Sequence, residues 1–277
     1  MNRTSRPRHS AEGGYQRGEE TRARIIGAAI RLFGDLGFDG ASTRDIAASA
    51  GVNAPALQYY FDNKEGVYAA CTQHIIDRVW VQIATPVEAA ERALADPASE
   101  DETLIEAYWA IQDRIIDFMF NSREADEWRL FMAREQAGLG PAVGFKLLND
   151  GVNRRMVAVK SGIVGRLLGQ PAADEDTLIR TMALGGAAHV FHVMRRNAFK
   201  ALGWEDVDSE RLARIRKIVR LQTVQLLSAM VQERDERAKS DSLGSRRSAA
   251  RSGAKPGTAS GTGGNAPDRG HSEGNAA

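Results

Sequence analysis

The chain has 277 residues, of which 43% are hydrophobic, so it can form a packed core and is not wholly disordered. Its single cysteine, Cys71, excludes a disulfide framework, a cysteine-type zinc site and an iron–sulfur cluster, and we expect a reducing, cytoplasmic setting. The net charge of +1 neither indicates nor excludes a nucleic-acid partner; no apolar run is long enough for a membrane span, and no secretory signal is expected.

Composition divides the chain into four parts, and the sequence predicts an all-α fold because no segment shows convincing strand alternation. Residues 1–18 form a polar, arginine-containing segment that we expect to be a flexible basic arm. Residues 19–66 are predicted to form three short helices, and residues 67–237 a larger helical domain. Residues 238–277 are rich in Gly, Ser and Ala, which predicts a disordered tail.

The first two helices of residues 19–66 have recognisable ends. Apolar residues recur at helical spacing between positions 25 and 36, and Gly37 provides the left-handed residue that commonly ends a helix. Ser42 and Asp45 form a capping-box pattern at the start of the second helix.

A tight turn separates the second helix from the third. Gly51 ends the second helix, Asn53 is placed to cap the third, and Pro55 lies in the first turn, where its missing N–H is tolerated. A short capped helix, a glycine turn and a second short helix are typical of a helix-turn-helix, whose second helix enters the DNA major groove. A purely structural helical subdomain is the alternative.

The side chains of this segment suit DNA. Thr43 is placed at a helix N-terminus for a phosphate oxygen, the amide of Gln58 can read adenine, and Pro55 and Ala56 can meet a thymine methyl group. Leu57 is expected to pack in the core. The candidate DNA-binding residues are Thr43, Arg44, Asn53, Ala54, Pro55, Ala56, Gln58, Tyr59, Tyr60 and Lys64.

These motifs resemble the DNA-binding domain of the TetR family of bacterial transcription regulators over residues 19–68. The resemblance is carried by the runs TRDIA (43–47), AGVN (50–53), LQYYF (57–61) and NKEGV (63–67).

The resemblance implies phosphate contacts from Thr43, Tyr59, Tyr60 and Lys64 and base contacts from residues 53–58. Gln58 departs from the pattern, since the family commonly has tyrosine there, which implies a changed operator preference.

Three later runs are similar to the CecR-like subgroup, which is associated with drug-responsive repression. They are FMAREQ (131–136), PAVGF (141–145) and ALGW (201–204). The family resemblance implies that residues 67–237 bind a small molecule and form a homodimer.

The end of the helical domain is predicted to be an antiparallel pair of long helices, over residues 174–199 and 209–237, and Pro86 is expected to separate earlier helices. Gly185 and Gly186 favour close helix packing, for which a twofold axis between subunits is one place. The expected dimer seam of the second helix is Leu212, Ile215, Val219, Leu226 and Met230.

Apolar and flexible side chains in the middle of the chain are candidate walls of an effector pocket, although ordinary core is the alternative for each. Arg134 and Glu135 are expected to pair with each other or with a neighbour. The candidate pocket residues are Trp109, Phe118, Met119, Phe131, Met132, Glu135, Met156 and His189.

His189 and His192 lie three residues apart and therefore share a helix face, a spacing that can bind a metal. The sequence offers no evident third ligand, so we expect interior or pocket histidines, and we predict no metal and no cofactor.

The combined interpretation is a homodimeric repressor that a small molecule releases from double-stranded operator DNA. The alternatives are a helical carrier or enzyme with a structural N-terminal subdomain, or an activator of the same fold. No phosphate-binding loop, activated nucleophile or clustered acid pair indicates an enzyme, and no catalytic residue is predicted.

Overall fold

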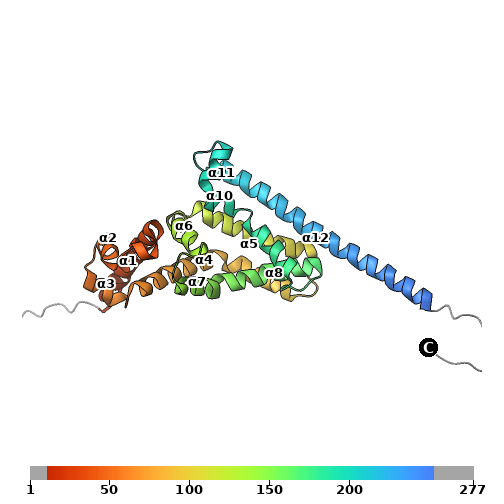
Figure 1. Ribbon diagram of the computed structural model, residues 1–277, viewed down its shortest axis with the longest axis horizontal. Coiled ribbons are helices and arrows are strands. Elements are labelled where there is room, and N and C mark those ends of the chain that lie inside the picture. Colours follow the sequence, from red (N-terminus) through yellow and green to blue (C-terminus); the bar gives the residue numbers. More distant parts are fainter. Residues whose placement is uncertain (1–10, 253–277) are drawn as a thin grey trace, which may run out of the picture. The chain divides into compact units, whose positions relative to one another are not determined.

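The computed structural model describes residues 11–252, and every regular element in this range is a helix, as predicted (Figure 1). The N-terminal helices are α1 (Ala11–Gly40), α2 (Thr43–Ser49) and α3 (Ala54–Tyr60), and they lie at one end of α4 (Lys64–Ala95). The later elements are α5 (Asp101–Asn121), α6 (Arg123–Gln136), α7 (Ala142–Leu148), the π-helical turn η1 (Asn149–Asn153), α8 (Arg154–Leu168), α9 (Glu175–Gly186), α10 (His189–Val193), α11 (Arg195–Leu202) and α12 (Ser209–Ser252).

The chain forms two compact units, one ending at Arg234 and the other beginning at Asp235. All of the sites below lie in the first unit. Within residues 11–252, no helix has an apolar stretch long enough to cross a lipid bilayer.

Two predicted boundaries differ from the structure. Residues 11–18 belong to α1 and residues 238–252 to α12, although we predicted a flexible arm and a disordered tail there. Both segments extend helices that are already formed, and extending a helix is much easier than starting one. The rest of the predicted arm and tail lies outside the described residues.

The first core cluster joins the N-terminal helices to the domain that follows. Ile25, Phe33, Ile46 and Leu57 come from α1, α2 and α3 and are almost completely buried, and Phe131 of α6 belongs to the same cluster. Helix α6 is therefore part of the core beneath the N-terminal helices as well as of the larger domain.

Two further clusters hold the larger helical domain. One contains Ile83, Tyr108 and Ile163, which come from α4, α5 and α8. The other packs Ile116 of α5 against Ile215 of α12. Neighbouring helices thus enclose the middle of α5 on several sides.

Pro86 does not separate two helices, because α4 continues through it. Proline lacks the N–H that would bind the carbonyl group of Gln82 four residues earlier. Arg114 of α5 donates its Nε to that carbonyl oxygen at 3.4 Å and binds the Gln82 side chain at 2.9 Å. A side chain from another helix therefore replaces the missing hydrogen bond.

The helix predicted over residues 174–199 is three shorter helices, α9, α10 and α11. The first break follows Gly185 and Gly186, consistent with the poor helix propensity of glycine. No other part of the described chain lies within 4 Å of the position that a Cβ would take at either residue, so the expected close packing does not occur within the chain.

Four residues of the predicted dimer seam face the interior of their own chain. Leu212, Ile215, Val219 and Met230 are buried in the second and third clusters. Only Leu226 of the predicted seam is exposed. The periodicity of α12 was correct, but its apolar stripe covers the chain's own core.

Candidate DNA-binding surface and effector cavity

Local hydrogen bonds set the boundaries of α2 and α3. The hydroxyl of Ser42 accepts from the Asp45 backbone N–H at 3.1 Å and donates to the Asp45 carboxylate at 2.6 Å. Asn53 Oδ1 accepts from the Ala56 N–H at 2.8 Å. Gly51, in the turn between the two helices, has a φ of +66°, which glycine adopts without steric cost. The predicted caps and turn are confirmed.

The apolar sides of α2 and α3 pack on α1 and so fix the orientation of both helices. Ile46 and Ala47 of α2 are buried, as are Leu57 of α3 and Phe61, which follows it. Leu57 is a packing residue, as expected. Their burial turns the other side of each short helix toward solvent.

The side facing solvent carries most of the predicted DNA-binding residues. Tyr59 is 84% exposed, and its ring meets the edge of Tyr60 with 5.3 Å between centroids. Thr43, Ala56 and Tyr60 are half-buried. The remaining exposed candidates are Arg44, Asn53, Ala54, Pro55 and Gln58.

Lys64 has a structural role that the sequence did not predict. Its ammonium group donates to the carbonyl oxygens of Asp39 and Ala41 at 3.5 and 3.3 Å. It also lies 4.5 Å from the centroid of the Phe38 ring. Since helices leave their last carbonyl groups without intrahelical donors, Lys64 stabilises the end of α1. Any contact with phosphate would be additional to this role.

A cavity of about 330 Å³ lies in the larger helical domain, and its lining comes from every element between α4 and α10. Its apolar lining residues are Ile75, Ile76, Val79, Ile83, Ile115, Phe118, Met119, Trp128, Met132, Ala133, Leu148, Val152, Met156, Val157, Met182, Gly185 and Val193. Its polar lining residues are Arg129, Gln136, Asn153, Lys160, Thr181, His189 and His192.

Five of the eight candidate pocket residues line this cavity: Phe118, Met119, Met132, Met156 and His189. The other three are not among its lining residues. Trp109 packs with α12, where the Arg220 guanidinium lies 5.6 Å from the centroid of its ring. Phe131 belongs to the N-terminal core, and Glu135 is bonded to Tyr68.

Two charged residues of the cavity, Arg129 and Lys160, were not among the candidates from the sequence, and Lys160 is the more deeply buried. It is only 5% exposed, and its Nζ donates to Gln112 Oε1 at 2.9 Å. Burial lowers the pKa of Lys160 to about 8, so the side chain is charged in most molecules near pH 7. Lys160 lies in a helically spaced apolar stripe with Met156, Ile163 and Leu167, and a lysine inside such a stripe was the available signal.

The two histidines line the cavity in their neutral form. Burial lowers the pKa of His192 to about 4, with Arg129 adding to the effect. Burial also lowers the pKa of His189, whose Nδ1 lies 3.0 Å from the carbonyl oxygen of Gly185. Among the described residues, no group of three or more potential ligands could hold a metal ion.

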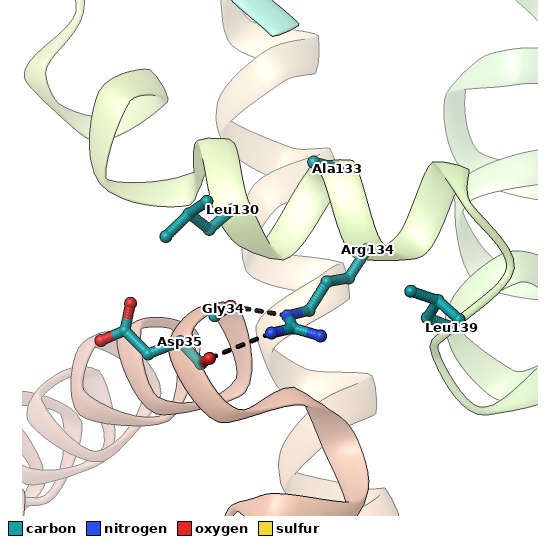
Figure 2. Close-up of a pocket in the computed structure, with 6 residues that line it drawn as sticks. All are labelled: Gly34, Asp35, Leu130, Ala133, Arg134 and Leu139. Atoms are coloured by element: carbon teal, nitrogen blue, oxygen red, sulfur yellow. Dashed lines mark hydrogen bonds between the residues drawn. The ribbon is translucent and has the colours of Figure 1, made fainter. Parts of the chain in front are cut away.

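Helix α6 connects the cavity with the N-terminal helices. The Arg134 guanidinium reaches from α6 to the end of α1, where Nε donates to the Gly34 carbonyl at 2.7 Å and Nη2 to the Asp35 carbonyl at 3.0 Å (Figure 2). Leu130 and Leu139 lie on either side of this contact in a shallow pocket. The two carbonyl groups precede Gly37, where α1 departs from helical geometry at a φ of +78°.

Two further contacts fix α6 in place. A Cβ at Gly34 would lie 3.2 Å from the Leu130 Cβ and the Phe131 backbone nitrogen, so the absence of a side chain allows α1 and α6 to approach closely. Glu135 is buried and accepts a hydrogen bond from the hydroxyl of Tyr68 in α4. The expectation that Arg134 and Glu135 pair with each other or a neighbour is met through neighbours.

Arg129, Met132 and Gln136 of α6 line the cavity, while Arg134 of the same helix is bonded to α1. A ligand that displaces the lining residues of α6 would therefore also strain the hydrogen bonds that Arg134 makes to α1. Such a helix provides a contiguous physical link between two sites.

Comparisons with known proteins agree with this arrangement. Residues 25–71 match the family model described as "Bacterial regulatory proteins, tetR family". Residues 104–230 match the model described as "HTH-type transcriptional dual regulator CecR, C-terminal domain". The protein of that name from Shigella flexneri is 30% identical over 203 residues, which cover 73% of this chain and 89% of the relative.

Solved structures share the fold. The crystal structure of AibR in complex with isovaleryl coenzyme A and operator DNA aligns with a TM-score of 0.51 and 17% identity, covering 72% of this chain and 96% of AibR. A TetR-family transcriptional regulator from Bordetella parapertussis 12822 aligns with a TM-score of 0.50 and 20% identity, covering 74% of this chain and 93% of that one.

Proposed function

Because the chain belongs to the TetR family of DNA-binding transcriptional regulators, and carries a CecR-type C-terminal domain, we propose that it acts as a homodimeric repressor that a small molecule releases from its operator. The family consists of regulators rather than enzymes, which removes the alternative of an enzyme or carrier with a merely structural N-terminal subdomain. The observation that carries the release step is α6, which lines the cavity and holds the end of α1.

The exposed side of α2 and α3 supports operator binding in the major groove. Gln58 is exposed on α3 and can place its amide against an adenine, while Arg44 on α2 is available to a phosphate. In a twofold dimer, two such surfaces would read half-sites separated by one helical turn of DNA or a multiple of it.

The homodimer is proposed to form through the exposed sides of α9 and α12. Ile179 and Met182 of α9 are exposed, as are Ile218, Leu221 and Leu226 of α12. A groove of about 660 Å³ lies between the two helices and includes Leu226 in its lining. Apolar side chains of this size on neighbouring helices are typical of an isologous interface.

The dimer face is tested by Leu221→Glu, with Val81→Glu, on α4, as the matched control. Both side chains are exposed, at 56% and 69%, so neither change should disturb the folding of the single chain. Sedimentation velocity should show a monomer for Leu221→Glu and a dimer for Val81→Glu and the wild type. A dimer that survives in Leu221→Glu would contradict this interface.

Operator binding is tested by fluorescence anisotropy with DNA from upstream of the protein's own gene. We expect tight, salt-dependent binding by the wild type and weaker binding by Leu221→Glu, because a monomer engages one half-site. One outcome would overturn the proposal: a folded dimer that binds neither this DNA nor any other fragment of the genome encoding it more tightly than it binds scrambled DNA.

The release step is tested by Arg134→Met, with Arg123→Met as the control on the same helix. Arg134 holds α1, whereas the Arg123 side chain is 93% exposed and pairs with Glu127 of its own helix. A releasing compound should weaken operator binding by about 5- to 150-fold in the wild type and the control. Arg134→Met should bind the compound normally and lose most of this effect; an unchanged effect would remove α6 from the mechanism.

Activation is the second candidate, and one observation favours it: the matched C-terminal model and the Shigella relative both carry the name "dual regulator". Deleting the gene and measuring transcripts from bound promoters separates the two. Repression predicts that these transcripts rise, and activation predicts that they fall.

A further inference from the structure

The charged side chains that line the cavity are all basic. They are Arg129 and Lys160, whereas the two lining histidines are neutral and the lining contains neither aspartate nor glutamate. The rest of the wall is mostly apolar. A cavity of this kind attracts anions and repels cations.

Lys160 is a buried cation without a counter-ion. Its contacts are the hydrogen bond to Gln112 and the ring of Tyr108, whose centroid lies 5.0 Å from Nζ. In the described part of the chain, no carboxylate pairs with it. Because a buried charge is costly unless it is paired, Lys160 would gain more from an anion in this cavity than an exposed lysine would gain in water.

Gln112 holds Lys160 in one place. Its Oε1 accepts from Lys160, and its Nε2 donates to the Leu184 carbonyl at 3.2 Å and the Gly185 carbonyl at 3.4 Å. The amide is thus fixed at both ends, and the lysine keeps two further N–H groups for a ligand. A positioned donor of this kind pays little ordering entropy when a ligand binds.

Arg129 is a second cationic residue in the lining of the cavity. Its Nε is buried without a hydrogen-bond partner, and its distance to Asp126 Oδ1, 3.7 Å, is too long for a hydrogen bond. The guanidinium of this lining residue therefore retains hydrogen-bonding capacity for a ligand.

We propose that the ligand of this cavity is a small amphipathic carboxylic acid, whose carboxylate pairs with Lys160 and whose apolar body packs among side chains such as Ile115, Phe118 and Met156. This inference rests on the proposed function, in which the same cavity receives the effector. The volume of about 330 Å³ lies at the small end of ligand pockets, which favours a medium-length chain or one ring over a larger molecule.

The test compares acids with their own uncharged and cationic counterparts. Isothermal titration calorimetry on the full chain would use octanoate, octanamide and octylamine, and then cinnamate, cinnamamide and cinnamylamine. Within each series the apolar body is constant and only the head group changes. We expect at least one of the two acids to bind about tenfold or more tightly than its amide, since hydrogen bonds to charged groups are the stronger ones, and we expect the amines to bind most weakly.

Lys160→Met assigns the effect to one residue, and Lys146→Met is the matched control. Lys146, on α7, is exposed, pairs with Asp150 and does not line the cavity. Lys160→Met should remove the preference for the acid, whereas Lys146→Met should retain it. Circular dichroism and thermal unfolding establish that both variants are folded.

Three outcomes overturn the inference: neither acid binds at millimolar concentration, neither binds more tightly than its amide, or the preference survives in Lys160→Met. Fluorescence anisotropy with operator DNA separates a failure of the ligand class from a failure of the proposed function. Acid binding that leaves DNA affinity unchanged contradicts the release step only, and release by an uncharged compound without acid binding contradicts the ligand class only.

Discussion

The candidate DNA-binding surface and the cavity are built in opposite ways. The surface takes its side chains from two short helices within residues 43–60, and local caps place them. The cavity takes its lining from elements spread between Ile75 and Val193. One site is defined by sequence neighbours, and the other exists only after distant helices have packed.

The difference shows how sequence neighbours, or two residues of one type, acquire different roles. Phe131 and Met132 are adjacent on α6, but Phe131 is 1% exposed in the N-terminal core, while Met132 lines the cavity. Lys64 and Lys160 are both lysines, but Lys64 binds carbonyl groups at the end of α1 and Lys160 is buried with Gln112. In each pair, the helices packed around the side chain set its role, which neither sequence position nor residue type reveals.

The largest expected effect separates Phe131 from Met132. Phe131→Ala should lower the free energy of unfolding by about 3–5 kcal/mol, because it leaves a hole in a packed aromatic cluster with Phe33 and Tyr68. Met132→Ala should cost less than about 2 kcal/mol, since its side chain already borders open space.

Urea unfolding measured by circular dichroism compares the two alanine variants. Equal losses of stability would mean that α6 has no distinct core and cavity sides. Calorimetry with octanoate gives the complementary result: Met132→Ala should change the affinity, whereas Phe131→Ala should not, provided that it remains folded.

The next effect concerns the charge of Lys160 and its dependence on pH. Burial lowers its pKa from 10.5 to about 8, so between these values the unfolded chain binds the proton more strongly than the folded chain does. The stability contributed by this residue is therefore present above pH 10.5 and is lost as the pH falls through 8. A shift of this size corresponds to roughly 3 kcal/mol.

The measurement is the difference in unfolding free energy between Lys160→Met and the wild type across this range. The variant should gain relative to the wild type as the pH falls from 10.5 to 8, by roughly 3 kcal/mol in total. Lys146→Met should show no such trend, because Lys146 is exposed. A flat difference for Lys160→Met would show that the lysine is solvated.

These contrasts explain what could be predicted from the sequence. The caps at Ser42 and Asn53, the turn at Gly51 and the packing role of Leu57 are local features, and all were predicted. Residue type likewise suggested candidate pocket walls, with ordinary core as the alternative, and Phe118, Met119, Met132 and Met156 do line the cavity.

Periodicity does not say what a buried side faces. Phe131 was assigned to the pocket and Ile215 to a dimer seam, and both are buried against other helices of their own chain. The continuity of α4 through Pro86 depends on Arg114, which is 28 positions away and carries no local signal for this role. Nonlocal partners decide such cases, and a single sequence does not list them.

A smaller effect, confined to one base pair, tests the DNA-binding surface. Gln58→Ala should relax preference at one position of each half-site by about 1–3 kcal/mol, because it removes the amide proposed to read adenine. Anisotropy with operators that carry each base pair at every position measures this loss. Unchanged preference at all positions would exclude Gln58 from base reading.

The smallest expected effect comes from a single exposed cation. Arg44→Ala should weaken binding to every sequence equally and reduce the slope of log affinity against log salt by about 0.9, the value for one lost phosphate contact. Lys64→Ala cannot serve this purpose alone, since Lys64 also binds the carbonyl groups of Asp39 and Ala41. Its loss should lower the melting temperature of the N-terminal helices, whereas Arg44→Ala should leave it unchanged. If Arg44→Ala alters base preference and not the salt slope, α2 approaches the bases rather than the backbone.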